Sequence, residues 1–568
     1  MEILPPQPIS VRNGFWPTAG SVGENVPDSV RTGYNVWFLG KGLKKSAKGL
    51  GTSSVGLGGP RLYLVGSKIG TMSIKGSIVP YKNGSYWFIG AGQASVDGVL
   101  VGNASSFLEY NLSTGPATAY PAGLHTPPVP LVSTRTAGIN SGTYAVVLTR
   151  INTKTGAESI GSLPSAPITV KNQKITVQFS GLDGGQDAWG VYFTAKGRAT
   201  TGPFLHLMDV LDSAIPGDDK MDFDFYDSQL QALEPPTDYN PPPQGDFVAT
   251  LGPVMIIINT FAGSNGIAAG VSPSVGNKPE AYPSVYTTFL NPYENCVGFA
   301  ARLTEGELVL WTNNSLQALV LTGVSSFPIL PRALWPTTGI QSPHGGCFAD
   351  AIFYAFAGKA GPVRLGGDEP DTTFAKPIIE YVRNQNWDPT TVIVGYDRVR
   401  DAVIFIGNGV DGPRALAFMR DPDDGRAWSL PIVLPSMPEA CITQNGQLKV
   451  SISGQLYDWE AGNGGNWLLV PSWQDAPNGA DRKTIRGYRA VVNSKGSNMT
   501  LDLLLNLSDT PVPGCSQTTS GAGLRQTPWM LFNKVGTQYT VQASGNGADH
   551  QVDDIQIQIW YEPGLTAK

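Results

Sequence analysis

The chain has 568 residues, a net charge of −6, 41% hydrophobic residues and only 15% charged residues. This hydrophobic content supports packed cores and excludes a disordered chain, and the acidic balance argues against a protein whose main task is to hold nucleic acid through its phosphates. The chain also contains 68 glycines and 45 prolines, and so many turn-forming residues among so few charges predict an all-β protein.

Residues 1–125 begin with MEILPPQPIS, which has an acidic residue and two prolines where a signal peptide has basic and apolar residues, so we expect no signal peptide. Short runs such as RLYLVG (61–66) and SYWFIG (85–90) then alternate apolar and polar residues between glycines. Alternation with a period of two predicts strands, and we expect residues 1–125 to contribute N-terminal strands to a β-propeller.

Residues 126–240 form the second predicted domain, with proline-rich segments at both ends, HTPPVP (125–130) and EPPTDYNPPP (234–243). Between them, alternating runs such as AWGVYFTAKG (188–197) supply about seven strand candidates in roughly 110 residues, the size of a small β-sandwich. The order of these runs resembles a fibronectin-III or Ig-like module. We therefore expect an inserted fibronectin-III/Ig-like β-sandwich.

Residues 241–480 repeat a hairpin pattern, as in ELVLWTNNSLQALVLTG (307–323) and TTVIVGYDRVRDAVIFIGN (390–408). The centres of the hairpins recur roughly every 40–55 residues, close to the length of one propeller blade. A four-stranded unit has two apolar faces that it cannot bury alone, so such units pack face to face around an axis. We therefore predict propeller blades over residues 241–480.

Residues 481–568 end with DDIQIQIWYEP (553–563), in which Ile555, Ile557 and Ile559 share one face of a strand. This strand has two open interpretations: it closes the propeller with N-terminal strands, or it belongs to a separate terminal sandwich. No window holds the roughly 18 apolar residues that span a bilayer, so we expect no membrane insertion. The predicted fold class is all-β, a β-propeller with an inserted fibronectin-III/Ig-like β-sandwich.

Catalytic and cofactor motifs are few. The segment HGGC (344–347) is similar to an esterase oxyanion loop, but no G-x-S-x-G motif supplies the nucleophile, and no Walker loop or G-x-G-x-x-G occurs. The histidines lack metal-ligand spacing, and no cysteine pair has the C-x-x-C form. We therefore predict a protein that is not an enzyme, with no catalytic residues and no cofactor, and four buried thiols at Cys296, Cys347, Cys441 and Cys515.

The aspartates of GDDKMDFDFYD (217–227) are the one weak metal candidate. Asp222 and Asp224 alternate along a strand and share a face, but a calcium site needs six to eight converging oxygens. Phe223 and Phe225 alternate with them, which is typical of a half-buried edge strand with a solvated face. We predict no metal and keep Asp222 and Asp224 as weak candidates.

The segment VPDSVRTGYNVWFLGKGLKKSAKGL (26–50) is a basic, hairpin-like stretch in a chain poor in charge. It resembles the proline leader and basic strand that open the nozzle (tail hub or tail tubular) proteins of short-tailed double-stranded DNA bacteriophages. Further segments follow in the same order as in that family: AWGVYFTAKG, then VGYDRVRDAVIFIG (394–407), then DDIQIQIWYEP. The succession of moderately specific motifs, rather than any single one, carries the resemblance.

The resemblance implies a structural virion component: a propeller subunit, six copies of which form a ring that continues the DNA channel below the portal and adaptor. Such a homohexamer takes part in DNA retention and ejection. The implied partners are the tail adaptor, tail fibres, and double-stranded DNA that passes without sequence recognition. The implied location is the virion tail, assembled in the host cytoplasm. An acidic body fits this role, because phosphates meet few persistent cations on it.

The basic stretch supplies the candidate interaction residues. They dock onto an acidic neighbour or lie at a constriction of the channel; a solvated edge strand whose lysines block aggregation is the other open interpretation. The candidate residues are Arg31, Lys41, Lys44, Lys45 and Lys48.

A second function stays open, a glycan-binding or glycan-cleaving β-propeller of a viral tail that acts at the host surface. DPDDGRAWS (421–429) resembles the Asp-box turn of sialidase-like propellers through Asp423, Gly425 and Trp428. Such turns plug blades and are not catalytic, so the motif indicates a fold rather than a reaction.

Overall fold

The fold is seen in a computed structural model, in which the chain is described over 25 ranges. These are residues 2–3, 7–9, 30–39, 43–55, 58–65, 68–72, 77–80, 85–89, 93–96, 99–103, 108–111, 123–153, 156–183, 185–260, 270–290, 294–302, 307–324, 327–365, 370–420, 427–462, 464–471, 473–475, 483–506, 508–547 and 549–561. Within these ranges α1 (Ile379–Gln385) is the single α-helix, and no helix there is long and apolar enough to cross a membrane. The prediction of an all-β protein is confirmed.

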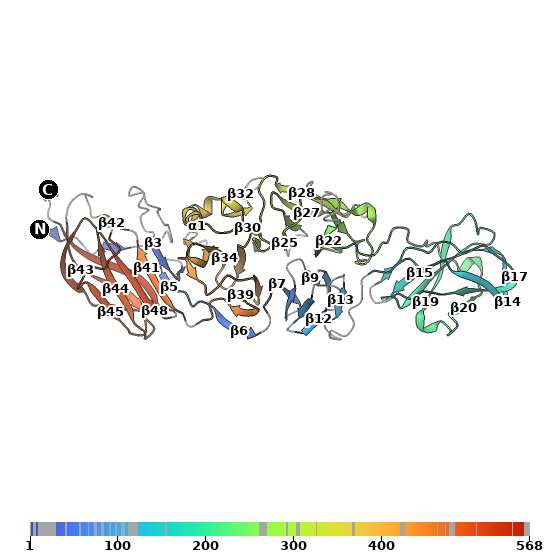
Figure 1. Ribbon diagram of the computed structural model, residues 1–568, viewed down its shortest axis with the longest axis horizontal. Helices are drawn as coiled ribbons and strands as arrows, with labels where there is room; N and C mark the ends of the chain where they lie inside the picture. The colour runs from blue at the N-terminus through green and yellow to red at the C-terminus, as the bar shows by residue number, and fades with distance from the viewer. Residues whose placement is uncertain are drawn as a thin grey trace.

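Three β bodies lie in a row along the long axis of the molecule (Figure 1). A terminal sandwich that contains both chain ends lies at one end, a propeller in the middle, and an inserted sandwich at the other end. Short 3₁₀ helices punctuate the connections: η3 (Asp212–Ala214), η4 (Asp227–Gln229), η5 (Ser284–Tyr286), η6 (Gly358–Ala360) and η7 (Thr373–Ala375).

The propeller is a closed ring of seven sheets in the described part of the chain. The innermost strand of each sheet packs beside the innermost strand of the next, and the last packs beside the first. In ring order these strands are β7 (Arg61–Val65), β9 (Ser77–Pro80), β21 (Phe247–Leu251), β25 (Gly298–Arg302), β29 (Gly346–Ala349), β33 (Ile393–Asp397) and β38 (Ala440–Gln444). The predicted propeller is therefore confirmed, and it has seven blades.

The outer strands complete the blades by antiparallel pairing. In the first two blades they are β8 (Lys68–Met72), β11 (Gln93–Val96) and β12 (Val99–Asn103), then β10 (Ser85–Ile89) and β13 (Leu108–Asn111). In the third and fourth blades they are β22 (Val254–Thr260), β23 (Gly270–Pro273) and β24 (Thr288–Phe289), then β26 (Glu307–Trp311), β27 (Leu316–Leu321) and β28 (Ile329–Trp335). In the last three they are β30 (Ile352–Phe356), β31 (Pro362–Leu365) and β32 (Pro370–Asp371), then β34 (Ala402–Gly409), β35 (Gly412–Met419), β36 (Ala427–Trp428) and β37 (Ile432–Val433), then β39 (Gln447–Ile452), β40 (Gln455–Asp458) and β6 (Gly51–Val55).

The ring is closed by a strand from the start of the chain. β6 pairs antiparallel with β40 as the outermost strand of the seventh blade, so that Gly51 lies opposite Asp458 and Val55 opposite Gln455. Closure leaves no exposed blade at which the ring can open or add another sheet. Large aromatic side chains fill the spaces between blades; Trp428, for example, is fully buried, stacks on Phe374 and donates from Nε1 to the Phe374 carbonyl at 2.7 Å.

The inserted sandwich is built from one continuous segment between β13 and β21, and its prediction is confirmed. One sheet contains β14 (Leu131–Tyr144), β17 (Ile168–Gln178) and β20 (Lys220–Phe223); the other contains β15 (Val146–Asn152), β16 (Ala157–Glu158), β18 (Ala188–Thr194) and β19 (Phe204–Leu211). Every residue of β18 is buried, and its Trp189 and Phe193 pack against Phe179 and Phe223 of the facing sheet and its edge. Because β18 is buried along its whole length, it forms the centre of this core.

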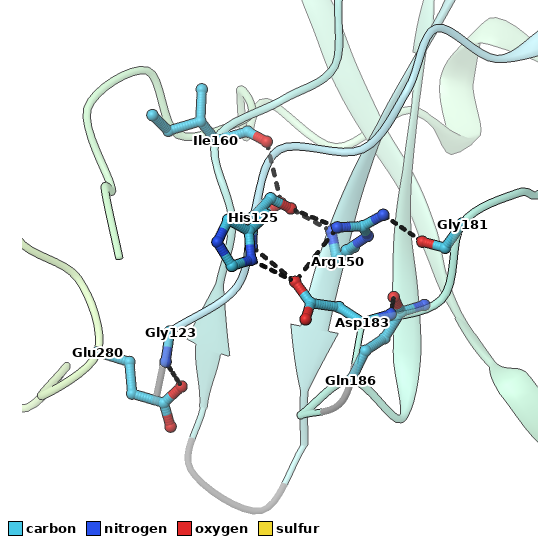
Figure 2. A network of polar contacts seen from close by, with 9 residues as sticks. Gly123, His125, Arg150, Ile160, Gly181, Asp183, Gln186 and Glu280 are labelled. Atoms are coloured by element: carbon cyan, nitrogen blue, oxygen red, sulfur yellow. Dashed lines mark hydrogen bonds and ion pairs between the residues drawn. The ribbon is translucent and has the colours of Figure 1, made fainter. Parts of the chain in front are cut away.

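Polar contacts join the inserted sandwich to the propeller (Figure 2). The Gly123 N–H donates to Glu280 Oε2 of the third blade at 2.7 Å. Two residues later, the N–H and ring Nδ1 of His125 contact Asp183 Oδ2 at 2.9 and 3.0 Å. Arg150 Nη1 donates to the His125 carbonyl at 3.0 Å and to Asp183 Oδ2 at 3.2 Å. His125, Arg150 and Asp183, which we call the linker clamp, thus attach this linker to the sandwich while Gly123 attaches it to the propeller.

The terminal sandwich combines strands from both ends of the chain. One sheet contains β1 (Glu2–Ile3), β2 (Gln7–Ile9), β4 (Val36–Leu39), β5 (Leu43–Ser46), β43 (Lys483–Asn493), β46 (Arg525–Gln526), β47 (Met530–Gly536) and β49 (Gln551–Tyr561). The other contains β3 (Val30–Tyr34), β41 (Asn466–Pro471), β42 (Gln474–Asp475), β44 (Met499–Leu505), β45 (Ser516–Thr519) and β48 (Gln538–Asn546). Ile555, Ile557 and Ile559 of β49 are buried between the sheets, as their alternation predicts.

Two predicted domain boundaries differ from the structure. Within residues 1–125, strands β1 to β5 lie in the terminal sandwich, and only β6 to β13 belong to the propeller. Within residues 241–480, strands β41 and β42 also belong to the sandwich. The reason is the long alternating strand β49, which pairs with β1, β2 and β5, while the ring is closed by β6. Of the two interpretations of residues 481–568, the structure has the terminal sandwich.

Candidate functional site

A cavity of about 820 Å³ lies at the centre of the propeller ring. The inner strands of five blades contribute to its wall, namely β7, β25, β29, β33 and β38, so it opens along the axis around which the blades are arranged. Its ionisable lining residues come from different blades and loops, which no local motif brings together. They are Arg61, Tyr63, His344, Cys347, Asp350, Tyr396, Arg398 and Cys441.

Arg61 begins the inner strand of the first blade and is only 5% exposed. Its Nη1 donates to the Tyr63 hydroxyl at 3.1 Å and its Nη2 to the Pro343 carbonyl at 3.3 Å. The guanidinium also lies over the rings of Phe247 and Phe299, 4.6 and 5.8 Å from their centroids. All of these partners are neutral.

His344 of the HGGC segment lies beside Arg61 in this cavity. Its Nε2 is 2.6 Å from the Pro60 carbonyl, and because a carbonyl oxygen only accepts, Nε2 carries the proton. Burial, reinforced by the charge of Arg61, lowers the pKa of His344 to about 3 despite the bond to Pro60. The imidazole is therefore neutral at physiological pH and adds no charge to the cavity.

Two of the four cysteines, Cys347 and Cys441, also line the cavity, where both are half-buried. Burial raises the pKa of Cys347, and it raises the pKa of Cys441 to about 12, so both thiols are protonated and poor nucleophiles. Cys296 and Cys515 are buried elsewhere in the chain. The predicted four buried thiols are thus two buried and two half-buried ones.

One carboxylate, that of Asp350, also lines the cavity. Asp350 Oδ2 pairs with Arg420 Nη1 at 2.9 Å, and the Tyr396 hydroxyl donates to Asp401 at 2.8 Å. Burial, together with the bond to Asp401, raises the pKa of Tyr396. Asp350 is the sole carboxylate among the described lining residues, whereas most glycoside hydrolases use two.

Three of the predicted interaction residues lie on strands of the terminal sandwich, and none of the described ones lines the cavity. Arg31 is on β3, and Lys44 and Lys45 are consecutive residues of β5. In the register Lys44 lies opposite Phe38 and Val552. Lys41 lies outside the described residues.

Lys48 is engaged within the chain. Its Nζ pairs with Asp549 Oδ2 at 3.0 Å, and its backbone N–H donates to Glu460 Oε2 at 2.8 Å. The next residue, Gly49, also donates to Glu460, at 3.3 Å. These contacts fasten the N-terminal segment to the propeller end and to the terminal sandwich, which is a role that the sequence alone did not indicate.

The weak metal candidates Asp222 and Asp224 are both used in the inserted sandwich. Asp222 Oδ1 accepts from the Thr176 hydroxyl at 2.7 Å, and Asp224 Oδ1 accepts from the Ile139 N–H at 2.7 Å. Among the described residues no group of three or more histidine, cysteine, aspartate or glutamate side chains is placed to hold a metal ion. The two aspartates therefore serve as hydrogen-bond acceptors within the inserted sandwich, for β17 and β14 respectively.

Comparisons with known proteins give similarity to solved structures only. No protein-family model matches the chain, and no curated protein matches it. An exo-β-1,3-galactanase from Phanerochaete chrysosporium with galactose is 9% identical, with 85% of this chain and 95% of that one covered and a TM-score of 0.16. A family 43 arabinoxylan arabinofuranohydrolase from Bacillus subtilis with cellotetraose is 10% identical, covering 90% and 96%, with a TM-score of 0.18. A structure described as a glycoside hydrolase is 9% identical, covering 89% and 100%, with a TM-score of 0.14.

These comparisons correct one prediction. The prediction of a protein that is not an enzyme is contradicted, because the three solved structures named above are glycoside hydrolases. Their TM-scores lie far below 0.5, so the likeness carries no argument about a reaction of this chain. The cavity was not predicted from the sequence, in which its available signals are Arg61 in the run RLYLVG and the HGGC segment.

Proposed function

We propose that the chain is a structural subunit of the tail of a short-tailed double-stranded DNA bacteriophage, of the nozzle type. The observation that carries the proposal is the arrangement of three β bodies in a row, with both chain ends in one of them. The segments that resemble nozzle proteins occupy all three bodies: the basic stretch on β3 to β5, AWGVYFTAKG on β18, VGYDRVRDAVIFIG on β33 and β34, and DDIQIQIWYEP on β49.

The structure supports this role mechanically. β6 completes the seventh blade and the terminal sandwich holds both chain ends, so the two ends of the chain are paired into the body. Six copies assembled around a lumen would present an acidic surface, which does not retain DNA phosphates. The tail adaptor and tail fibres are the further partners in this proposal, and the virion tail is the location.

A surface for subunit contacts is available on the edge strand β47 of the terminal sandwich. Its exposed residues include Leu531 and Val535, which are 69% and 55% exposed, and Leu524 nearby in the sequence is 57% exposed. Apolar side chains on an edge strand favour association with another chain. We therefore assign β47 to the contact between neighbouring subunits.

The oligomeric state tests the proposal. Mass photometry and negative-stain images of the purified chain, alone and with the portal and adaptor, are expected to show a hollow six-fold ring. The double variant Leu531→Asp/Val535→Asp is expected to reduce the ring to monomers, while Val410→Asp, an exposed apolar residue of the β34–β35 connection, leaves it intact. A chain that stays monomeric with its partners present contradicts the proposal.

A second candidate function is a glycan-binding or glycan-cleaving propeller of a viral tail, acting at the host surface. The observation in its favour is the axial cavity, which combines a guanidinium, tyrosine hydroxyls, a carboxylate and the aromatic side chains of Phe299 and Phe348. A glycan array and a hydrolysis assay on host-surface polysaccharides test it. Strong glycan hits or released sugar support this function, and neither result depends on ring formation.

A further inference from the structure

Arg61 differs from the other buried arginine of the described residues. Arg150 is 7% exposed and pairs with Asp183, whereas Arg61 is 5% exposed and forms no ion pair with any described carboxylate. Its two hydrogen bonds go to a hydroxyl and a carbonyl, and its buried Nε, like that of Arg150, has no hydrogen-bond partner within the described chain. Among the described residues, Arg61 is thus a buried cation without an anion.

Such an arrangement is costly. A charge removed from water needs an opposite charge or a full set of hydrogen bonds, and buried charges in folded proteins are normally paired. The rings of Phe247 and Phe299 offset part of this cost through cation–π attraction, but they supply no negative charge. An anion in the space beside Arg61 would pair with this charge and offset the remaining cost of its burial.

The space beside Arg61 is the axial cavity. Its volume of about 820 Å³ falls within the range of pockets that enclose a small organic molecule. His344, which lies next to Arg61, is neutral, and the lining residue Asp350 is already paired with Arg420. Arg61 therefore supplies the positive potential at its own end of the cavity.

We propose that the axial cavity binds a small molecule of about monosaccharide size that carries one oxyanion, a carboxylate or a phosphate. The oxyanion lies against the Arg61 guanidinium, and the apolar face of the molecule lies against Phe299 and Phe348. Arginine suits both oxyanions because its planar donors match two oxygens at once. This site goes beyond the tail role, since it concerns the lumen of one subunit and not the ring.

The test measures ligand binding by calorimetry and thermal shift on the full chain at constant ionic strength. The probes are glucuronate for the carboxylate, glucose 6-phosphate for the phosphate, and glucose as the neutral sugar. One or both anionic probes are expected to bind and to raise the melting temperature, and glucose is not. The probe that binds more tightly identifies the kind of oxyanion.

Two variants locate the site. Arg61→Met is expected to weaken binding of the anionic probe at least about 10-fold, the effect of losing one charge-assisted contact, without lowering the melting temperature of the free protein. Ala351→Trp fills the exposed edge of the cavity while Arg61 stays in place, and it is expected to abolish binding. Arg332→Met, which removes an exposed arginine paired with Glu307, is the matched control and leaves binding unchanged.

Three outcomes overturn the proposal: no probe shifts the wild-type melting temperature, glucose binds as tightly as its anionic counterparts, or Arg61→Met and Ala351→Trp both bind as the wild type does. If Arg61→Met fails to fold, Ala351→Trp alone decides, because its substitution lies at the exposed edge and leaves the core intact.

Discussion

The inserted sandwich and the terminal sandwich are both two-sheet β bodies, but the chain assembles them in opposite ways. The inserted one takes all of its strands from a single segment, β14 to β20. The terminal one pairs strands from the two ends of the chain, so that Glu2 lies opposite Tyr561 and Ile9 opposite Ile555. The inserted sandwich therefore depends on local sequence. The terminal sandwich forms only when the chain between its two sets of strands brings them together.

This difference has consequences for stability and folding. The strands of the terminal sandwich that come from opposite ends meet only after the propeller has brought them close, because closing a loop of that length costs entropy that no local contact repays. The propeller depends in turn on the N-terminal segment, which supplies β6 to its seventh blade. The terminal sandwich and the ring are therefore coupled, whereas the inserted sandwich is an independent unit.

The largest expected effect follows from removing the N-terminal segment. Deletion of residues 1–55 removes β1 to β6, which leaves β49 paired only with β43 and β40 paired only with β39, and we expect this to open both the sandwich and the ring. We expect an aggregating protein with no cooperative thermal transition.

The fragment 123–245, which contains the whole inserted sandwich, is expected to fold alone and to melt in one transition. Circular dichroism and size-exclusion chromatography decide, and a deleted chain that melts like the full one contradicts the coupling.

A smaller effect is expected from the linker clamp. Arg150→Met removes the cation that pairs with the Asp183 carboxylate, which keeps only its contacts with His125, and it removes the donor to the His125 carbonyl; breaking such a buried pair costs about 3–5 kcal/mol. The free energy of unfolding of the inserted sandwich should fall by that order in chemical denaturation, with the propeller unchanged. Lys48→Gln, which breaks a partly exposed ion pair with Asp549, is the matched control and should cost less than about 1 kcal/mol. Equal losses in both variants would show that the clamp is no stronger than a surface pair.

The same contrast explains what the sequence could predict. The inserted sandwich is local, and its alternation, proline-rich ends and buried run AWGVYFTAKG were enough to predict it. The terminal sandwich is not local, and nothing in the basic stretch indicates that β5 pairs with β49, with Lys45 opposite Gln551. The alternation of Ile555, Ile557 and Ile559 predicted a strand but not its partners.

The blade number shows a second limit. The hairpin rhythm is clear from β21 onward, but the first two blades are interleaved: β7 and β8 lie in one blade, β9 and β10 in the next, β11 and β12 back in the first, and β13 in the second. A chain that passes between blades has no repeat to detect. The candidate site is harder still, since Arg61, His344 and Asp350 meet only because the ring closes. The sequence of HGGC is similar to an esterase oxyanion loop, whereas in the structure His344 is a neutral residue that lines the cavity beside Arg61.

The smallest expected effect is a difference in acid sensitivity between the terminal sandwich and the inserted sandwich. His550 of the terminal sandwich is 1% exposed and accepts at Nδ1 from Trp467 at 2.9 Å, and burial lowers its pKa. For a group whose folded pKa is depressed, the unfolded chain binds the proton first, so stability falls as the pH drops below about 6.5, the ordinary value.

In the inserted sandwich, burial alone would raise the pKa of Asp183, but the contacts from His125 and Arg150 hold it below its ordinary value. Stability from that carboxylate is therefore lost only below about pH 4.

Hydrogen exchange of the full chain between pH 6.5 and 4.5 should accordingly show amides of β43 to β49 opening as the pH falls, with those of β14 to β20 still protected. The amides of the propeller are expected to lose protection over the same pH range. The pKa of His344 in the folded propeller is lowered to about 3, so the stability of the propeller also falls as the pH drops below the ordinary value for histidine. His550→Gln removes the titrating group and should flatten the response of the terminal sandwich alone. If the inserted sandwich instead opens before the terminal sandwich on acidification, the inserted sandwich is not the more acid-resistant of the two, and the expected difference between them is contradicted.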